Sequence, residues 1–218
     1  MKNLGILISG SGTNLQAIID NIENGFIPAK ISIVISNNPS AYGIKRAERK
    51  GIPVEVINHK DFSSREDFEK ALIDCLEKHK VDYVILAGFM RVLTKFFINH
   101  YKDRILNIHP ALLPSFPGVN AQKQAFDYGV KFSGCTVHFV TEKVDHGPII
   151  IQAVVPVLQD DTPEKLQKRI LEKEHIIFPL AIKMLVEEKL QISGNKVIWK
   201  VPVENMKDMY MINPYISF

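Results

Sequence analysis

The amino-acid sequence predicts an α/β protein built on a doubly wound, mostly parallel sheet with an antiparallel C-terminal extension. The first half of the 218 residues alternates short apolar runs with amphipathic stretches, which is the β-α-β-α order of such sheets. Several of these runs are apolar on both faces, as parallel strands covered on both sides are. Ligands of such sheets bind outside the carboxyl ends of the strands.

Five strands and four helices are expected in the first half. The strands are predicted at 4–9, 31–36, 54–57, 83–87 and 105–108. The helices between them are predicted at 14–23, 42–50, 65–79 and 94–101. Crossovers between successive parallel strands should be right-handed.

The second half opens with a rigid loop that contains Pro110, Pro114 and Pro117. The elements predicted after this loop are a helix at 120–128, strands at 136–140 and 149–157, a helix from 163 toward 189 and a strand at 197–200. The long helix has Thr162 as its expected cap, Pro163 at its first position and Pro179 as a candidate interruption. The tail 201–218 carries apolar residues that are expected to pack back, but it is assigned no position.

Composition limits the class of protein. The chain has the length of one domain, and with 46% hydrophobic and 23% charged residues it has the balance of a globular protein. The net charge is +3 and the basic residues are dispersed, so nucleic acid is not an expected partner. Cys75 and Cys135 match no zinc or redox spacing. No run is long enough to span a bilayer and the N-terminus has no signal-peptide pattern, so a cytoplasmic protein without a membrane partner is expected.

The segment Ile105-Leu106-Asn107-Ile108-His109-Pro110 carries the strongest chemical signal. In an extended strand, Asn107 and His109 point to one side while Leu106 and Ile108 point to the other. Pro110 biases the preceding histidine toward extended geometry and ends the strand there. A carboxamide beside an imidazole at a strand end suits oxyanion stabilisation and proton transfer. The alternative is a polar pair satisfied by loop backbone.

Asp145, in the turn Asp145-His146-Gly147-Pro148, is the candidate partner of His109. A carboxylate near an imidazole orients it and favours its protonated form, although the same aspartate could simply satisfy turn amides. His138 and His146 lie nearby in sequence, but no helical His pair or Cys/His cluster supports a metal site. No metal is expected, and His138 is interpreted as a packed, hydrogen-bonded strand residue.

A glycine-rich loop, Gly10-Ser11-Gly12-Thr13-Asn14, joins the first strand to the first helix. Its exposed amides and the helix dipole favour an anion. The lysine of the Walker pattern and the third glycine of the dinucleotide fingerprint are both missing, so a single phosphate group fits best. The alternative is a plain turn with Asn14 or Thr13 as the helix cap.

Three further features suggest ligand contacts. Glu174 falls in the middle of the apolar stripe of the long helix, where a carboxylate must be paired, protonated or used for binding. Glu174 could form an ion pair with Arg or Lys, or it could bind hydroxyl or amine groups of a ligand. Arg65, in the first turn of a helix, could hold a substrate carboxylate or be an ordinary surface cation. The residues Met90, Arg91, Val92 and Leu93 could contact a flat heteroaromatic ring or belong to the core.

Together these pieces resemble the phosphoribosylglycinamide formyltransferases, folate-dependent enzymes of purine synthesis. The matching motifs are Ser9-Gly10-Ser11-Gly12-Thr13-Asn14-Leu15-Gln16, Leu86-Ala87-Gly88-Phe89-Met90-Arg91, Leu106-Asn107-Ile108-His109-Pro110-Ala111-Leu112-Leu113-Pro114, Val137-His138-Phe139-Val140 through Asp145-His146-Gly147-Pro148, and Glu174-His175 followed by Pro179. They run in order from about residue 3 to 190. The first motif is the most diagnostic, because the Asn-x-His-Pro and Asp-x-Gly-Pro motifs belong to the wider superfamily.

The resemblance implies a Rossmann-like formyltransferase fold that transfers a formyl group from 10-formyltetrahydrofolate to the amine of glycinamide ribonucleotide. It implies a catalytic set of Asn107, His109 and Asp145, a phosphate site at Gly12, Thr13 and Asn14, and a contact of Glu174 with the ribonucleotide. The implied folate contacts are Arg65, Met90, Arg91, Val92, Leu93, Asn107, Thr141, Glu142, Lys143, Val144 and Asp145. It also implies a cis Leu113-Pro114 bond.

One domain, 1–218, is therefore expected, with a phosphate-binding half at 1–100, a catalytic and folate-binding half at 101–200 and a tail at 201–218. The expected partners are small-molecule substrates, and the chain is expected to be a monomer or a weak homodimer. Ser115 stands where the superfamily commonly has a basic residue, and His146 replaces a frequent glycine. Both departures could alter folate affinity or loop geometry.

The expected mechanism is direct transfer, in which Asn107 and a protonated His109 stabilise a tetrahedral oxyanion and Asp145 keeps His109 charged. Another acceptor for the same donor remains an alternative: water, a sugar amine or methionyl-tRNA. A non-catalytic sensor of a phosphorylated ligand is the alternative from another class.

Overall fold

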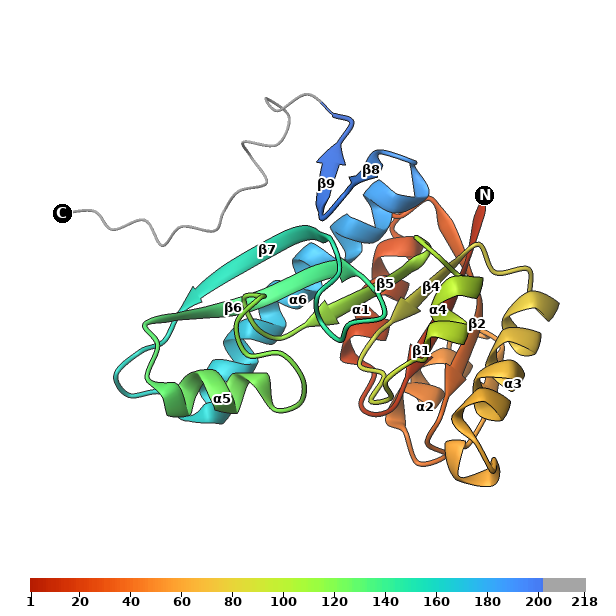
Figure 1. The fold of residues 1–218 in the computed structure, drawn as a ribbon, viewed down its shortest axis with the longest axis horizontal. Coiled ribbons are helices and arrows are strands. Elements are labelled where there is room, and N and C mark those ends of the chain that lie inside the picture. The colour runs from red at the N-terminus through yellow and green to blue at the C-terminus, as the bar shows by residue number, and fades with distance from the viewer. Residues whose placement is uncertain (202–218) are drawn as a thin grey trace.

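The computed structural model describes residues 1–201, and the helices and strands of this part alternate along the chain (Figure 1). The strands are β1 (Lys2–Ile8), β2 (Ala29–Ser36), β3 (Val54–Val56), β4 (Tyr83–Leu86), β5 (Ile105–His109), β6 (Phe132–Phe139), β7 (Ile149–Pro156), β8 (Leu190–Ser193) and β9 (Lys196–Trp199). The helices are α1 (Thr13–Glu23), α2 (Tyr42–Glu48), α3 (Arg65–Lys78), α4 (Lys95–His100), α5 (Ala121–Tyr128) and α6 (Pro163–Val186), with a short 3-10 helix η1 (His59–Asp61).

All the strands of this part of the chain form one sheet in the order β3-β2-β1-β4-β5-β6-β7-β9-β8. The strands from β3 to β5 are mutually parallel. The chain moves outward from β1 to β3 and then returns to β4 and β5 on the other side, which places a topological switch point between β1 and β4. β5, β6 and β7 are antiparallel neighbours. The predicted fold class, a mostly parallel doubly wound sheet with an antiparallel extension, is confirmed.

Two buried apolar clusters cover the two faces of the sheet. One contains residues of α1 and α6, and the other contains residues of α3 and α4. The side chains of β5 alternate between the two clusters: Leu106 and Ile108 belong to the first cluster and Ile105 belongs to the second. The predicted alternation therefore holds, and Asn107 lies on the face of Ile105. In Figure 1 the antiparallel pair β6–β7 extends away from the parallel part of the sheet.

Several predicted boundaries are wrong for identifiable reasons. Strand β6 begins at Phe132, before the predicted start at 136, because Ser133 and Gly134 resemble turn residues in sequence yet pair with β7. Helix α6 continues through Pro179, which is buried, so core packing outweighs the one missing backbone hydrogen bond. The helix stops at Val186, and the short strand β8 that follows was not predicted.

Other local expectations are met. Thr162 caps α6 by accepting a hydrogen bond from the Lys165 N–H at 3.3 Å, and the Leu113-Pro114 bond is cis. Within residues 1–201, no helix has both the length and the apolar character needed to cross a bilayer. The tail predicted at 201–218 lies, from residue 202 onward, outside the described residues.

Gly134 provides a test of the β6–β7 pairing. A Cβ atom at this position would lie 1.8 Å from the Ala153 carbonyl oxygen and 2.8 Å from Leu112 Cδ2. We expect Gly134→Ala to lower the free energy of unfolding by about 1–3 kcal/mol, measured by urea denaturation, because the two strands must separate locally.

The matched control is Ser133→Ala in the same strand. The Ser133 hydroxyl is buried without a hydrogen-bond partner among the described residues, so its removal should leave stability unchanged or raise it. Equal stability of the two variants would contradict the observed packing around Gly134.

Candidate active site

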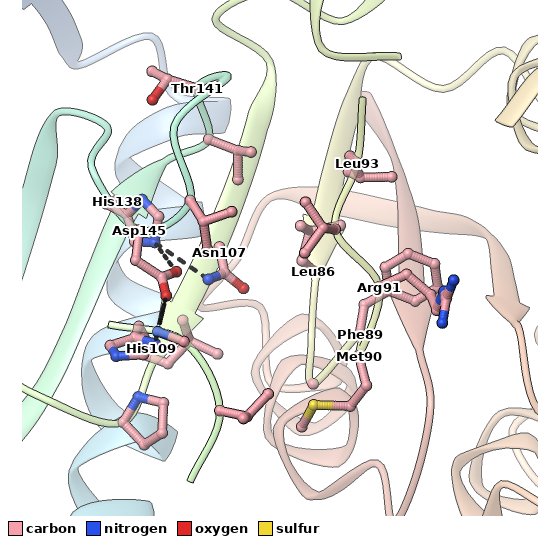
Figure 2. Close-up of a pocket in the computed structure, with 18 of the residues that line it drawn as sticks. Leu86, Phe89, Met90, Arg91, Leu93, Asn107, His109, His138, Thr141 and Asp145 are labelled. Carbon is pink, nitrogen blue, oxygen red and sulfur yellow. Dashed lines mark hydrogen bonds and ion pairs between the residues drawn. The ribbon is translucent and has the colours of Figure 1, made fainter. Parts of the chain in front are cut away.

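Two adjoining cavities open at the carboxyl ends of β1, β4 and β5. The first has a volume of about 460 Å³ and the second about 300 Å³. The residues that line both are Gly88, Met90, Ile108, Pro110, Gln122 and Gln167. Figure 2 shows the first cavity, with Asn107, His109, His138 and Asp145 gathered on one side and the segment from Leu86 to Leu93 on the other.

Asn107 faces a histidine across the sheet. The register of β5 and β6 places Asn107 directly opposite His138, and the Asn107 Nδ2 lies 3.2 Å from the His138 Nε2. His138 Nδ1 lies 2.9 Å from the Phe139 carbonyl oxygen, so Nδ1 carries the hydrogen. With Nε2 unprotonated, His138 accepts there from the Asn107 amide, and the second amide hydrogen remains for a ligand.

His109 lies at the end of β5 and is 4% exposed. Its Nε2 donates to the Phe116 carbonyl oxygen at 2.8 Å, and its Nδ1 lies 3.4 Å from Asp145 Oδ2. The same carboxylate oxygen accepts from the Gly118 N–H at 2.8 Å, while its other oxygen lies 3.7 Å from His138 Nε2. The predicted meeting of Asn107, His109 and Asp145 is thus found, with His138 as an additional neighbour.

Burial and nearby groups act in opposite directions on the pKa of His109. Burial lowers the pKa of His109 below its ordinary value of 6.5, and the attraction of Asp145 and the hydrogen bond to Phe116 only partly oppose this effect. Asp145 thus favours the charged imidazole, as expected, but burial outweighs it, and the protonated His109 of the expected mechanism stays a prediction. The sequence could not predict this lowering of the pKa, because it does not show how completely the loop 110–118 covers the imidazole.

Asp145 is held in its ionised form. Burial raises the pKa of the Asp145 carboxyl, but the contact with His138, the Gly118 N–H and the nearby His109 together outweigh it and keep the pKa below its usual value. Asp145 itself has a positive φ of 53°, a conformation that aspartate tolerates better than most residues. A fixed negative charge therefore faces a predominantly neutral imidazole.

The glycine-rich loop lines the second cavity with Gly10, Gly12, Thr13 and Asn14 among its residues. Gly12 has a φ of 70° and precedes α1 without a side-chain cap. A Cβ there would lie 2.6 Å from the Cα of Gly43. The alternative of a turn capped by Asn14 or Thr13 is wrong, and the amides at this helix start are left for a ligand.

Glu174 closes the other side of the second cavity. The side chain is 6% exposed, and its Oε2 accepts from the Asn14 Nδ2 at 2.7 Å. Burial raises the pKa of Glu174, partly offset by that hydrogen bond. The alternative of an ion pair with Arg or Lys is wrong among the described residues. Asn14 Oδ1 is buried and has no hydrogen-bond partner within 1–201.

One serine joins the walls of the two cavities. The Ser9 N–H donates to the Gly88 carbonyl oxygen at 3.1 Å, and the Met90 N–H donates to Ser9 Oγ at 2.7 Å. The Ser9 hydroxyl in turn donates to Asn37 Oδ1 at 2.5 Å. The start of the segment 88–93, which lines the first cavity, is therefore tied to the strand that leads into the glycine-rich loop.

The structure brings together most of the predicted ligand contacts but not all. Met90, Arg91, Val92, Leu93, Thr141, Glu142 and Val144 line the first cavity. Lys143 lines neither cavity, and Arg65 is exposed on the first turn of α3 and also lines neither. Their contacts with a folate remain predictions.

Sequence reasoning missed His138, Gln122 and Gln167 as lining residues. The apolar neighbours of His138 indicated a core strand, and the two glutamines carried no motif. Across residues 1–201, no cluster of three or more His, Cys, Asp and Glu side chains is arranged to hold a metal ion.

This architecture defines an α/β protein with an amide, an imidazole and a carboxylate at the carboxyl end of a parallel sheet, beside an anion-suited helix start. A family model described as formyl transferase matches residues 2–182. The chain therefore belongs to the formyl transferase family.

Particular relatives are similar over most of this chain. The trifunctional purine biosynthetic protein adenosine-3 of Drosophila melanogaster is 50% identical over 194 residues, which are 88% of this chain and 14% of that protein. Phosphoribosylglycinamide formyltransferase of Haemophilus influenzae is 45% identical over 195 residues, which are 89% of this chain and 92% of that protein. The crystal structure of glycinamide ribonucleotide transformylase 1 from Symbiobacterium toebii superposes with a TM-score of 0.90 and 50% identity, covering 91% of this chain and 94% of that one. This chain spans 14–20% of the length of the trifunctional relatives that it matches.

The pKa of His109 can be measured directly. We expect its imidazole to titrate below 6.5 in an NMR titration of the histidine ring protons, because burial disfavours the charged ring. In Asp145→Asn the midpoint should fall further, since the nearby negative charge is lost. A depressed histidine pKa contributes folding stability that is present above about pH 6.5 and is lost as the pH falls.

The control is Asp74→Asn, a change of an exposed aspartate on α3 that lines neither cavity, which should leave the His109 midpoint where it is in the unchanged protein. A His109 midpoint above 6.5, or a rise in the Asp145→Asn protein, would show that the carboxylate, not burial, dominates.

Proposed function

We propose that this chain transfers the formyl group of 10-formyltetrahydrofolate to the amine of glycinamide ribonucleotide, a reaction of purine biosynthesis. The observation that carries the proposal is the position of Asn107, His109 and Asp145 in a cavity that shares a wall with a second, phosphate-suited cavity. The names of the relatives, phosphoribosylglycinamide formyltransferase and trifunctional purine biosynthetic protein, support the same substrates. A cytoplasmic location and a single domain, with the phosphate-binding half at 1–100 and the catalytic half at 101–200, are part of this proposal.

The ribonucleotide fits the second cavity. Its phosphate would accept hydrogen bonds from the amides at the start of α1, where the helix dipole favours negative charge. Glu174 and Asn14 present a carboxyl and a free amide oxygen at the same cavity, and these acceptors suit hydroxyl or amide hydrogens of the ligand. The amine would then lie toward the wall that the two cavities share.

The formyl donor fits the first cavity. Phe89, Val92 and Leu93 provide apolar surface, and the backbone between Met90 and Leu93 offers hydrogen bonds to a flat ring. Asn107 and Asp145 line the opposite wall, so the formyl group of a molecule placed here would lie beside the amide hydrogen that Asn107 has free.

In the proposed reaction, the neutral amine attacks the formyl carbon, and the carbonyl oxygen becomes an oxyanion that accepts a hydrogen bond from Asn107. His109 starts neutral, and the proton released by the attacking nitrogen reaches its Nδ1 through water at Asp145, because both ring nitrogens face protein acceptors. The resulting imidazolium has both N–H groups directed at acceptors, Phe116 O and Asp145 Oδ2, and its charge stabilises the oxyanion. The carbon–nitrogen bond to the folate then breaks, and the proton passes to the departing nitrogen.

The test is a spectrophotometric assay of the purified protein with 10-formyltetrahydrofolate, with and without glycinamide ribonucleotide. Loss of the formyl group should require the ribonucleotide, and Asn107→Ala should slow turnover on the order of a hundredfold or more, since one oxyanion donor contributes about 2.7–4 kcal/mol. Equal loss of formyl without the ribonucleotide would favour a hydrolase. Binding of both molecules without any transfer would favour a sensor.

The phosphate site makes a separate prediction. Gly12→Ala introduces a Cβ 2.6 Å from the Gly43 Cα and should raise the KM for the ribonucleotide about tenfold, or about 1.4 kcal/mol. The KM for the folate should change little. Steady-state kinetics with each substrate varied in turn would measure both.

Gly51→Ala is the control, because Gly51 also has a positive φ, 64°, but a methyl group added there would meet no atom within 4 Å, and the residue lies outside both cavities. Gly51→Ala therefore carries a similar backbone strain without the close contact that Gly12→Ala makes with Gly43. An equal change of KM in both variants would remove the glycine-rich loop from ribonucleotide binding.

A further inference from the structure

Glu69 is a buried carboxylate that the proposed mechanism does not use. It lies on the inner face of α3, is 1% exposed and has Phe68, Leu72 and Ile73 as buried neighbours on the same helix. No Lys, Arg or His of the described residues forms an ion pair with it. A carboxylate buried without a cation is costly unless hydrogen bonds satisfy it.

Within the part of the chain that the structure describes, both hydrogen bonds that the Glu69 side chain accepts come from one residue. The Thr94 N–H donates to Oε1 at 2.7 Å, and the Thr94 hydroxyl donates to Oε2. Thr94 directly precedes α4 and follows Leu93, the last residue of the segment that lines the first cavity. Glu69 therefore fixes the end of that segment to α3.

The segment 88–94 is held mainly at its two ends. At its start, Gly88 and Met90 are bonded to Ser9, and at its end Thr94 is bonded to Glu69. Within the described residues, Arg91, Val92 and Leu93 make no backbone–backbone hydrogen bond. Their N–H and C=O groups are therefore available to a ligand, and their positions depend on the two anchored ends.

We propose that Glu69 is a positioning residue for the formyl donor, which holds the segment 88–94 in the shape that binds the folate ring. The inference rests on the proposed function, because it assigns the folate to the first cavity. A segment that is already ordered loses less entropy on binding, so the anchor raises affinity without touching the ligand. Gly88 and Met90, which also line the second cavity, are held by Ser9. The rest of that cavity has supports in α1 and α6, so the ribonucleotide site should not depend on Glu69.

Two substitutions of Glu69 separate the effect of the hydrogen bonds that hold the segment 88–94 from the effect of the negative charge. Glu69→Leu removes both acceptors and leaves the Thr94 N–H without its partner. Glu69→Gln keeps an oxygen for that N–H, and the Thr94 hydroxyl can reverse to accept from the new amide. The matched control is Glu66→Leu, on an exposed position of the same helix.

The experiment measures tetrahydrofolate binding by calorimetry and the KM of each substrate. Glu69→Leu should weaken tetrahydrofolate binding and raise the KM of the formyl donor by roughly tenfold or more, because the Thr94 N–H loses its partner and the segment 88–94 loses one of its two anchors. The KM of the ribonucleotide should stay within about twofold. Glu69→Gln and Glu66→Leu should both behave like the unchanged protein.

Thr94→Val provides a second test that does not depend on the folding of Glu69→Leu. It removes the hydroxyl alone, so it should raise the donor KM without changing the ribonucleotide KM, and it should add little when combined with Glu69→Leu. If the unchanged protein binds no tetrahydrofolate, the proposed function fails. If it binds tetrahydrofolate and neither Glu69→Leu nor Thr94→Val weakens that binding, or if both KM values rise equally, the role of Glu69 is refuted.

Discussion

β5 and β6 run antiparallel, and this one pairing determines which side chains meet in the site. The register sets His138 opposite Asn107 and Thr136 opposite His109. The chain that leaves β6 then returns to β7 through the turn that contains Asp145, which brings the carboxylate to 3.4 Å from the imidazole. A shift by one residue would turn Asn107 and His109 to the opposite face of the sheet. The arrangement of side chains in the site therefore depends on the backbone hydrogen bonds between β5 and β6.

Burial and hydrogen bonding act in opposite directions at the titratable groups of the site. His109 has acceptors at both ring nitrogens, which favours the imidazolium, yet burial lowers its pKa. Glu174 is likewise buried, and its pKa is raised despite a hydrogen bond from Asn14. At each group, burial disfavours the charged form and outweighs the hydrogen bonds that favour it. A negative charge that develops beside His109 would shift that balance, which suits a group that must gain and lose a proton.

Much of this arrangement follows from the sequence. The strand pattern placed Asn107 and His109 on one face, and the short turn placed Asp145 near them. The glycine pattern located the helix start, and the apolar stripe singled out Glu174. The sequence could not show the pairing register of β5 and β6, or how completely the neighbouring loop buries His109. His138 enters the site because of the residue opposite it on another strand, and the pKa of His109 depends on how the loop 110–118 folds over it. Glu69 gave no signal, since one acidic residue in an amphipathic helix resembles any surface glutamate.

The close approach of Gly12 and Gly43 has a consequence for how such a chain can change. A methyl group on Gly12 would lie 2.6 Å from the Gly43 Cα, and one on Gly43 would lie 3.2 Å from the Gly12 Cα. Two backbones thus approach each other where the first two helices begin, and the Gly12 position has no room for a methyl group while Gly43 stays in place. A side chain on Gly12 would push α2 away from α1, and one on Gly43 would also meet Ile8 Cδ1 at 2.6 Å. The glycine-rich loop is in this way constrained from behind, by a helix that lines neither cavity.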